Sequence, residues 1–544
     1  MSAQSSPIRY RRLRAPQENH SVVVDPPLDE VGSLVDQNVE LRAQYEYDCR
    51  GRSLVDLSRE ARAELLAAAR RYTADYCDVG SQPGDPAGLI FLAGHQPQLF
   101  HPGVWLKNFV LDHLARRHGA VAVNLSIDSD TVKDTSLRVP GGSVSRPSVE
   151  AIPYDRVAPV VPYEQRRIED RDLFSQFGRR VAARVAPLVP HPLIETYWPL
   201  VQQQSRRTDN LGACLAQARH RLETDWGVET LEIPQSRVCD GMPFCWFAAH
   251  LLAELPRFRA VYNQTVREYR QVHRIRSTAH PVPDLAADDD WLEAPFWVFS
   301  TDDPRRRRLF ARHRADTVTL SDRHALEIDL PLHAGGDAAR AVERLMELQT
   351  QGVKIRSRAL ITTLWARLVL GDLFLHGIGG AKYDQVTDAL IERFFGLKPP
   401  RFVLFSATLH LPVERQPVNV EQSRALRQEL RRLTYHPERF IDRSSSRTVE
   451  IPGDPGELIA AKQSWIRIPQ TLQNARRRCR AIRQINESLQ CWVRCRREEL
   501  QRQLARTSRA LEADGVLASR RYAFCLYPEE TFREFLLQLL HRIA

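Results

Sequence analysis

The most constraining feature of this chain is an alternation of apolar runs with one amphipathic segment between residues 88 and 127. The run GLIFLA (88–93) is typical of a strand that is buried on both faces, and AVAVNLSI (120–127) has the same character. Between them, residues 104–119 place apolar side chains at helical spacing and end at Gly119. A strand, a helix and a strand in this order predict a βαβ unit with a right-handed crossover. The sequence therefore predicts an α/β fold built on a parallel sheet.

The same alternation returns in the second half of the chain. There the pattern predicts a helix, a strand, a turn, a helix and a strand, in this order, at 357–371, 372–377, 378–384, 385–396 and 401–411. Between the halves we expect a helical region at about 163–225, a strand at 226–234 and a small antiparallel insert at 296–313. A helix is also predicted at 58–76, ahead of the first strand. Repeated alternation of strands and helices is typical of the doubly wound class.

The C-terminal part has a different texture. Residues 457–512 contain almost no glycine or proline apart from Pro469, and they alternate charged side chains with leucine and isoleucine. This composition predicts a long helical hairpin or coiled coil, with Ile482, Ile485 and Leu489 on its apolar stripe.

We therefore expect four parts along the chain. They are a flexible basic tail and lead-in (1–50), an α/β core (51–454), a coiled coil (455–520) and a C-terminal segment that returns to the core (521–544). The core is expected to carry connecting insertions at about 150–225 and 235–330.

Composition narrows the class of protein. Hydrophobic residues make up 43% and charged residues 26%, as in an ordinary globular protein, and no apolar stretch is long enough for a membrane span. The first residues lack the apolar region of a secretory signal. Nine scattered cysteines without a CxxC pair indicate reduced thiols rather than disulfides or a zinc site. We expect a cytoplasmic protein that makes no membrane contact.

The net charge of +10 is compatible with nucleic-acid binding or with surface arginine interleaved with acidic side chains. The basic runs at 305–308 and 475–483 lack the interleaved aromatic residues of a stacking platform, which favours the surface interpretation. Six of the 77 basic residues are lysine. In such an arginine-rich chain, a lysine indicates a position that needs a compact ammonium rather than a planar guanidinium.

Three polar segments follow predicted strands, at the edge of the sheet where ligands of open α/β sheets bind. They are GHQPQLFHPGVWLKN (94–108), DSDTVKD (128–134) and HGIGGAKYD (376–384). Each contains one of the six lysines, namely Lys107, Lys133 and Lys382. We expect the three segments to converge in one cleft, with Lys107 and Lys382 on the same face of the sheet.

The first segment combines glycine, histidine and glutamine. Gly94 permits the chain to turn at the strand end, and Gly103 opens the helix so that its amides can face an anion. His95 and His101 could hydrogen-bond a phosphate or act as a general acid. The alternative is that His95 and Gln96 only hold the loop in place.

The second segment is acidic. Asp128, Asp130 and Asp134 could hold a divalent cation, orient a substrate amine or act as a base. The alternative is a solvated turn that Lys133 neutralises.

The third segment places two adjacent glycines, Gly379 and Gly380, before a predicted helix. Such a turn can present backbone amides to a carboxylate or a phosphate. The segment lacks the GxxxxGK[ST] spacing of a P-loop and the GxGxxG of a dinucleotide fold.

In this order the three segments resemble those of the BshC-type cysteine-adding enzymes of bacillithiol biosynthesis. GHQPQLFHPG (94–103) is similar to the family's GQQPGLF, the aspartates at 128–134 to its E-D-H-D cluster, and GGAKYD (379–384) to its GGPGE. Three departures from the family pattern surround the pocket. His95 replaces the first glutamine, the acidic cluster has lost its histidine, and Lys382 stands in place of the Pro-Gly pair.

The resemblance implies a Rossmann-like, HUP-type parallel-sheet core with helical insertions and a C-terminal α-helical coiled coil that forms a homodimer. The implied reaction is that of a carbon–nitrogen ligase, which joins the carboxyl group of cysteine to the amine of a glucosaminyl-malate. Forming an amide from a free acid and an amine in water is uphill, and a nucleotide of the ATP or ADP type is the implied source of activation.

The resemblance also implies roles for residues of this chain. Gly94, Gly103, Gly379 and Gly380 would cradle a phosphate or carboxylate. His95 and Lys107 would stabilise developing negative charge, and Asp128 or Asp130 would position or deprotonate the amine. The other candidate binding residues are Gln96, His101, Asn108, Lys133, Lys382 and Asp384, and no metal ligand is assigned. The alternative function is a non-catalytic coiled-coil interaction protein with a degenerate nucleotide-binding-like core.

Overall fold

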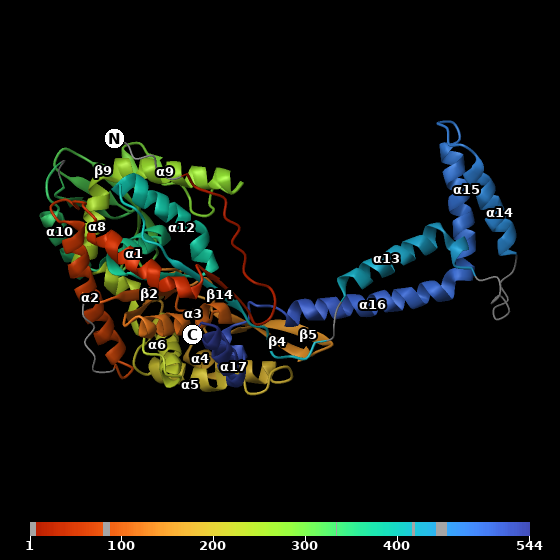
Figure 1. Ribbon diagram of the computed structural model, residues 1–544, viewed down its shortest axis with the longest axis horizontal. Helices are drawn as coiled ribbons and strands as arrows, with labels where there is room; N and C mark the ends of the chain where they lie inside the picture. Colours follow the sequence, from red (N-terminus) through yellow and green to blue (C-terminus); the bar gives the residue numbers. More distant parts are fainter. Residues whose placement is uncertain (1–6, 80–86, 333–334, 416–418, 442–453, 544) are drawn as a thin grey trace. The chain divides into compact units, whose positions relative to one another are not determined.

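The structure is a computed structural model that describes residues 7–79, 87–332, 335–415, 419–441 and 454–543. It contains two compact units, and the elements of both are labelled in Figure 1. The first unit comprises Met1–Val139, Glu150–Pro412 and Arg520–Ala544. The second comprises Pro140–Val149 and Val413–Ser519.

The first unit is built on a mixed six-stranded sheet. Its strands are β1 (Ser21–Asp25), β2 (Ile90–His95), β3 (Val121–Ser126), β6 (Leu231–Pro234), β13 (Leu373–His376) and β14 (Val403–Thr408). They lie in the order β1-β14-β13-β2-β3-β6, and all neighbours are parallel except β1, which is antiparallel to β14. The order therefore reverses between β2 and β13, since later strands are added first on one side of β2 and then on the other. The predicted α/β class with a parallel sheet is confirmed.

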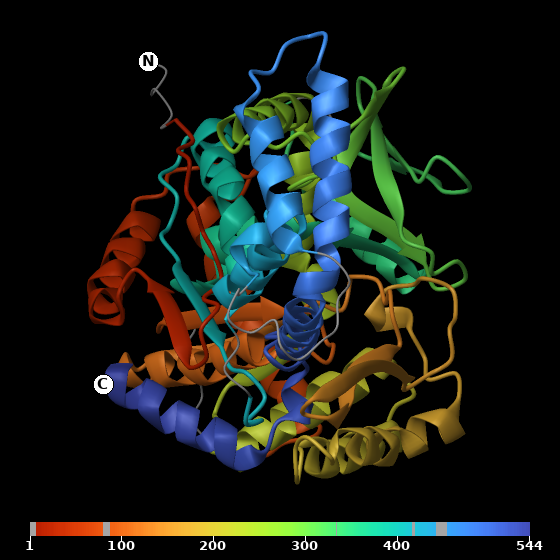
Figure 2. The same ribbon diagram turned by 90° about the vertical axis from the view of Figure 1, so that its right-hand side faces the viewer.

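Helices cover both faces of this sheet. One face carries α3 (Pro102–Arg117), α6 (Leu211–Asp225) and α17 (Glu529–Ile543), and the other carries α2 (Leu54–Ala74), α11 (Ala359–Trp365) and α12 (Ile378–Leu390). Figures 1 and 2 show α3 and α12 on opposite sides of the sheet. Right-handed crossovers require this placement, because α3 leads from β2 to β3 in one direction and α12 leads from β13 to β14 in the other.

Local sequence accounts for the boundaries of these helices. α2 begins after Ser53, whose side chain accepts a hydrogen bond from the Asp56 amide, and α3 has a proline at its first position. Gly119 has a φ of +62° just after α3, a left-handed conformation that glycine adopts without strain. The core of the face that α2 covers includes Ile90 and Leu92 of β2, which alternate with residues that face α3.

The insertions fold as separate layers of the first unit. The helices between β3 and β6 include α4 (Arg171–Val185) and α5 (Ile194–Ser205), as predicted for the region at 163–225. After β6 come α7 (Gln235–Cys239), α8 (Met242–Ala253) and α9 (Leu255–Val272), and α10 (Ala339–Thr350) precedes the last insertion strand. The hairpin of β4 (Ser136–Ser143) and β5 (Arg146–Pro153) precedes α4.

A second sheet replaces the small insert that the sequence predicted. It contains β7 (Ala287–Asp288), β8 (Trp291–Ser300), β9 (Arg307–His313), β10 (Val318–Ser321), β11 (Glu327–Leu330) and β12 (Val353–Ser357). Its main path is β11-β10-β9-β8-β12, all antiparallel. The antiparallel character is confirmed, and the sheet is larger because β12 joins it from the far side of α10. β12 leads directly into α11, which brings this sheet to the edge of the main one.

The N-terminal region predicted as a tail and lead-in (1–50) contains β1 and α1 (Val31–Ala43), both after residue 20, and residues 1–6 of the tail lie outside the described residues. Thr408 Oγ1 donates a hydrogen bond of 2.6 Å to the Pro16 carbonyl.

One local prediction is wrong. Residues 378–384, predicted as a turn, are the first two turns of α12. There, packing on the sheet overrides a local pattern that is rich in glycine.

In its described residues the second unit holds the tip of the β4–β5 hairpin and four α-helices, α13 (Val420–Tyr435), α14 (Pro455–Arg467), α15 (Ala475–Ser488) and α16 (Arg494–Leu517). α13 packs against α16 through a small core of Leu426, Leu433, Val493 and Leu500, and α14 packs against α15. The single hairpin expected over 457–512 is therefore not what forms. The chain breaks at 468–474, and α16 pairs with α13, a segment that the sequence had assigned to the core. Leu489 is buried, whereas Ile482 and Ile485 are only partly so.

Candidate functional site

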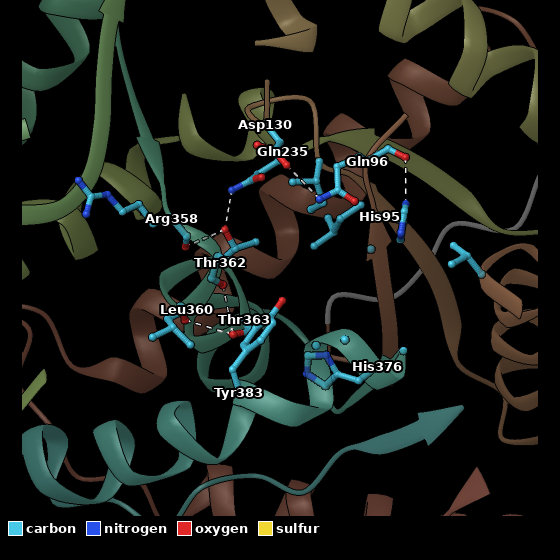
Figure 3. A pocket seen from close by; sticks show the side chains of 18 of the residues that line it. His95, Gln96, Asp130, Gln235, Arg358, Leu360, Thr362, Thr363, His376 and Tyr383 are labelled. Carbon is cyan, nitrogen blue, oxygen red and sulfur yellow. Dashed lines mark hydrogen bonds between the residues drawn. The ribbon is translucent and has the colours of Figure 1, made fainter. Parts of the chain in front are cut away.

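A pocket of about 720 Å³ opens at the carboxyl ends of the parallel strands (Figure 3). Each of the three segments singled out by sequence contributes to its lining. The contributors are Gly94, His95, Gln96, His101, Gly103 and Lys107 from the first, Ser129 and Asp130 from the second, and His376, Gly379, Gly380 and Tyr383 from the third. The predicted convergence of the three segments is confirmed. The pocket lies where the strand order reverses, the usual ligand position in open α/β sheets.

Lys107 supplies a buried positive charge. Its side chain comes from α3, is 3% exposed, and donates a hydrogen bond of 2.9 Å from Nζ to the Gly94 carbonyl. Among the described residues no carboxylate lies within 4 Å of Nζ. Burial, together with the charge of Arg219, lowers the pKa of Lys107 to about 8. The ammonium is still charged at neutral pH, and a buried charge without a partner is costly unless a ligand supplies one.

The N-terminus of α12 faces the same pocket. Gly377 precedes the helix and no side chain caps it. The first backbone hydrogen bond of this end runs from the Ala381 amide to the Gly377 carbonyl, at 3.0 Å. The amides of Ile378, Gly379 and Gly380 precede that bond, as the first donors of any helix do. A side chain at Gly377 or Gly379 would meet no atom within 4 Å, and both residues line the pocket, so there is open space beside the start of the helix.

The N-terminus of α3 differs from that of α12. His101 caps it, since its Nδ1 accepts a hydrogen bond of 3.1 Å from the Gly103 amide. Gly103 therefore does not present its amide to a ligand as predicted. Its lack of a side chain has another cause, because a Cβ there would collide with the Ala407 carbonyl oxygen of β14. Burial, with Arg520 and Arg521 nearby, lowers the pKa of His101 to about 4.

His95 is neutral in this setting. Burial and the Lys107 ammonium lower the pKa of His95 to about 3, and its Nδ1 lies 3.2 Å from the Gln96 carbonyl oxygen. The ring therefore offers a hydrogen bond rather than a positive charge.

Asp130 is the acidic group of the lining. Its carboxylate accepts hydrogen bonds from Gln96 Nε2 at 3.1 Å and from Arg306 Nη1 at 3.2 Å. Arg306 also donates to the Ser129 carbonyl at 2.8 Å, and its guanidinium lies 4.3 Å from the centre of the Trp297 ring. Gln96 and Arg306 thus fix the orientation of Asp130 at the pocket wall.

Six of the predicted site residues do not line the pocket: Asn108, Asp128, Lys133, Asp134, Lys382 and Asp384. Asn108 donates to Glu223 at 2.8 Å inside a buried network, and Lys133 is exposed. Asp128 accepts a hydrogen bond of 2.9 Å from the Ser236 amide, and burial, together with Glu164, raises its pKa to about 7. It therefore anchors the chain after β6 rather than facing a ligand.

Lys382 is exposed on α12, and Lys107 lies on the opposite face of the sheet. The expectation that the two lysines share a face is wrong. Because residues 378–384 form a helix rather than a turn, its neighbours Ala381 and Asp384 face the core and position 382 falls on the solvent-exposed side of α12.

The sequence missed the contribution of the second sheet. The charged residues of the lining are Lys107, Asp130, Arg306, Arg308, Arg358 and Arg520, of which three arginines come from the second sheet or its junction with α11. The run at 305–308 was the one available signal, and it was interpreted as surface charge. A polar cluster was also missed, in which Gln235 Nε2 donates to Ser357 Oγ at 2.6 Å and to Thr362 Oγ1 at 2.7 Å. No local sequence motif predicts this cluster, because its members come from distant parts of the chain.

Within the described residues, no group of three or more His, Cys, Asp or Glu side chains is arranged to hold a metal ion. No helix in the described part of the chain has the length and apolar character needed to cross a membrane. In comparisons with known proteins, no family model matches this chain, and no curated protein sequence is similar to it.

Proposed function

We propose that this pocket binds an anionic small molecule and that the protein is a BshC-like carbon–nitrogen ligase. In this proposal an amino acid, cysteine in the family, is joined through its carboxyl group to the amine of a small sugar-type acceptor. The observation that carries the binding step is the Lys107 ammonium, which is buried with no carboxylate beside it and faces the same space as the amides of α12. An anion would satisfy both.

The strand order supports a Rossmann-like core. Numbered along the chain, the five parallel strands lie in the order 3-2-1-4-5, which is the order of the doubly wound nucleotide-binding folds. Helical and antiparallel insertions interrupt it between consecutive strands, as the resemblance implies.

The pocket fits the phosphates of a nucleotide of the ATP or ADP type. Gly377 and Gly379 leave open space beside the start of α12, whose first amides can donate to a phosphate. The Lys107 ammonium supplies a positive charge that would balance the charge of the phosphate. Such a nucleotide would supply the activation of the carboxyl group. Lys107 and the α12 amides would hold its anionic part, and Asp130 would orient the acceptor amine by accepting one of its hydrogen bonds.

Turnover tests the reaction class. The purified protein should form the cysteinyl conjugate from cysteine and glucosaminyl-malate, detected by mass spectrometry, with ATP present and absent in parallel. Asp130→Asn should lower turnover about 100-fold while leaving affinity for ADP within a fewfold of wild type, since the carboxylate contacts the amine and not the anion. If no conjugate forms while ADP binds, the anion site stands and the ligase assignment falls.

Exposed apolar side chains of the second unit favour a second role for the protein, self-association. Ile466 is 48% exposed, Ile468 is 41% exposed and Leu472 is fully exposed, and all three lie at or just after the end of α14. We propose that this surface forms a homodimer contact. Light scattering should show a dimer that Leu472→Glu shifts toward monomer, with Leu537→Glu, another exposed leucine, as the control. A monomer at every concentration would contradict the proposal.

A further inference from the structure

His376 lies at the carboxyl end of β13 and lines the pocket, although sequence gave no reason to select it. Its side chain is 4% exposed, and its ring packs against those of Phe374 and Phe402. Ring Nε2 lies 2.8 Å from Asp384 Oδ2. Figure 3 shows His376 and Tyr383 on one side of the pocket, with His95 and Gln96 on the other.

The carboxylate that holds His376 is itself held. Asp384 is fully buried and forms an ion pair with Arg367, whose second nitrogen lies 2.6 Å from Asp388 Oδ1. Burial alone would raise the pKa of Asp384, but Arg367 and the His376 ring outweigh it and keep this pKa well below its usual range. Asp384 is therefore ionised at neutral pH, and its Oδ2 lies at ion-pair distance from ring Nε2. Its predicted binding role is replaced by a positioning role.

The ring of His376 is neutral and its tautomer is set. Burial lowers the pKa of His376 below its ordinary value, with Arg367 and Lys107 acting in the same direction and Asp384 opposing them. A carboxylate oxygen 2.8 Å from Nε2 favours the proton on that nitrogen, which leaves the lone pair of Nδ1 as an acceptor. Nδ1 points toward the start of α12, because a Cβ on Gly380 would lie 2.6 Å from it. Within the described part of the chain no side chain or backbone amide donates a hydrogen bond to Nδ1.

The other two histidines of the described lining are less suited to accept a proton. His101 already uses its Nδ1 to accept the Gly103 amide. His95 contacts no carboxylate and stands beside the Lys107 ammonium, which makes it the weakest base of the three. A general base needs a fixed orientation as well as an accessible nitrogen. Of these three histidines, only His376 has one ring nitrogen beside an ionised carboxylate, that of Asp384.

We propose that His376 is the proton acceptor of this pocket, oriented by Asp384 and acting on a substrate held at the N-terminus of α12. This rests on the proposed ligase function. In the step it serves, the acceptor amine attacks the carbonyl carbon of an activated acyl donor and a C–N bond forms. The donor's leaving group departs with its bonding electron pair, and the amine proton passes to His376 Nδ1.

Chemical modification tests the open nitrogen without requiring turnover. Diethylpyrocarbonate acylates neutral, accessible imidazole nitrogens, and peptide mass spectrometry locates the product in the full-length protein. We expect His376 to be modified between pH 6 and 8 and to be protected by inorganic pyrophosphate. A His376 that stays unmodified while exposed His324 reacts would overturn the proposal. Modification of His376 that pyrophosphate leaves unchanged would instead count against the anion site and leave the open base standing.

Kinetics separates a catalytic role from a structural one. His376→Gln should lower kcat about 100- to 10,000-fold with little change in KM, and it should remove the acidic limb of the pH profile below pH 6.5. Its affinity for pyrophosphate should stay within a fewfold of wild type. The matched control is His324→Gln, which lies outside the pocket. Wild-type kcat in a folded His376→Gln protein, or an unchanged acidic limb, would contradict the proposal.

Discussion

The β2–α3 and β13–α12 connections occupy equivalent places on the two sides of the strand-order reversal, yet they present different chemistry. At the first, His101 caps the helix and Lys107, the sixth residue of α3, turns inward to the Gly94 carbonyl. At the second, no side chain caps the helix and Lys382, the fifth residue of α12, is exposed.

The difference follows from what covers each helix. α3 is enclosed by the sheet on one side and by α6 and α17 on the other, so a long side chain in its middle is driven toward the pocket. One face of α12 is exposed to solvent, and the Lys382 side chain lies on that face. Under the proposed function, the two connections would bind one anion together, with a point charge from α3 and free amides from α12.

Removing the point charge has the largest expected effect. Lys107→Met should weaken ADP binding about 10- to 100-fold, because a charged hydrogen bond is worth roughly 1.5–3 kcal/mol. Lys382→Met should bind as wild type does, since that side chain is outside the pocket. Isothermal titration calorimetry measures both. Equal losses in the two variants would erase the contrast between the connections.

A side chain added beside the first amides of α12 should have the next largest effect on ADP binding. Gly380→Ala places a Cβ 2.6 Å from His376 Nδ1, so the ring must shift and the start of α12 with it. We expect about a tenfold loss of ADP affinity and a lower Tm. Gly379→Ala meets no atom within 4 Å, and its Tm should equal or exceed that of wild type by the usual gain of alanine over glycine. Thermal unfolding of the two variants distinguishes a specific contact from general intolerance of side chains.

The charge on Lys107 also predicts the pH dependence. With a pKa of about 8, the ammonium loses its proton as the pH rises through 8, so ADP affinity should be constant from pH 7 to 7.5 and fall severalfold by pH 9. The same fall in Lys107→Met would assign it to another group.

The folding stability of the ligand-free protein should rise with pH in the range where ADP affinity falls. The pKa of Lys107 in the folded state lies below the ordinary lysine value of 10.5, so the folded state binds fewer protons than the unfolded state between about pH 8 and 10.5. The destabilising contribution of this group is therefore fully present below pH 8 and is relieved as the pH rises through that window. Without ligand at pH 7, Lys107→Met should raise Tm by a few degrees. A lower Tm would mean that the fold itself needs the ammonium.

The cap of α3 gives the smallest expected change. His101→Ala removes the acceptor of the Gly103 amide and should cost about 1 kcal/mol of folding stability, as loss of an N-cap does. It should also free that amide and bring α3 closer to the behaviour of α12. Denaturant unfolding checks the stability, and ADP affinity equal to or above that of wild type checks the amide.

Sequence alone determined the α/β class of the core and the meeting of three polar segments at one edge of the sheet. Short apolar runs bounded by glycine announce parallel strands, and the carboxyl ends of such strands meet at one edge whatever their separation in the chain. That rule was enough to bring together Gly94, Asp130 and Gly379. The start of α12 was harder to predict, because the glycines at 377, 379 and 380 have the local pattern of a turn. They form the start of a helix only when α12 packs on the sheet.

Tertiary structure alone decided which side chains face the pocket. Lys107 and Lys382 are equivalent by motif, and what covers each helix separates them. Arg306, Arg358 and Gln235 reach the pocket from elements far along the chain, and His376 becomes a base only through Asp384. Side-chain direction depends on the surrounding packing, and burial sets the pKa of a charged group. Neither quantity is encoded within a few residues of the group concerned, so local pattern could place these side chains near the site but could not assign their roles.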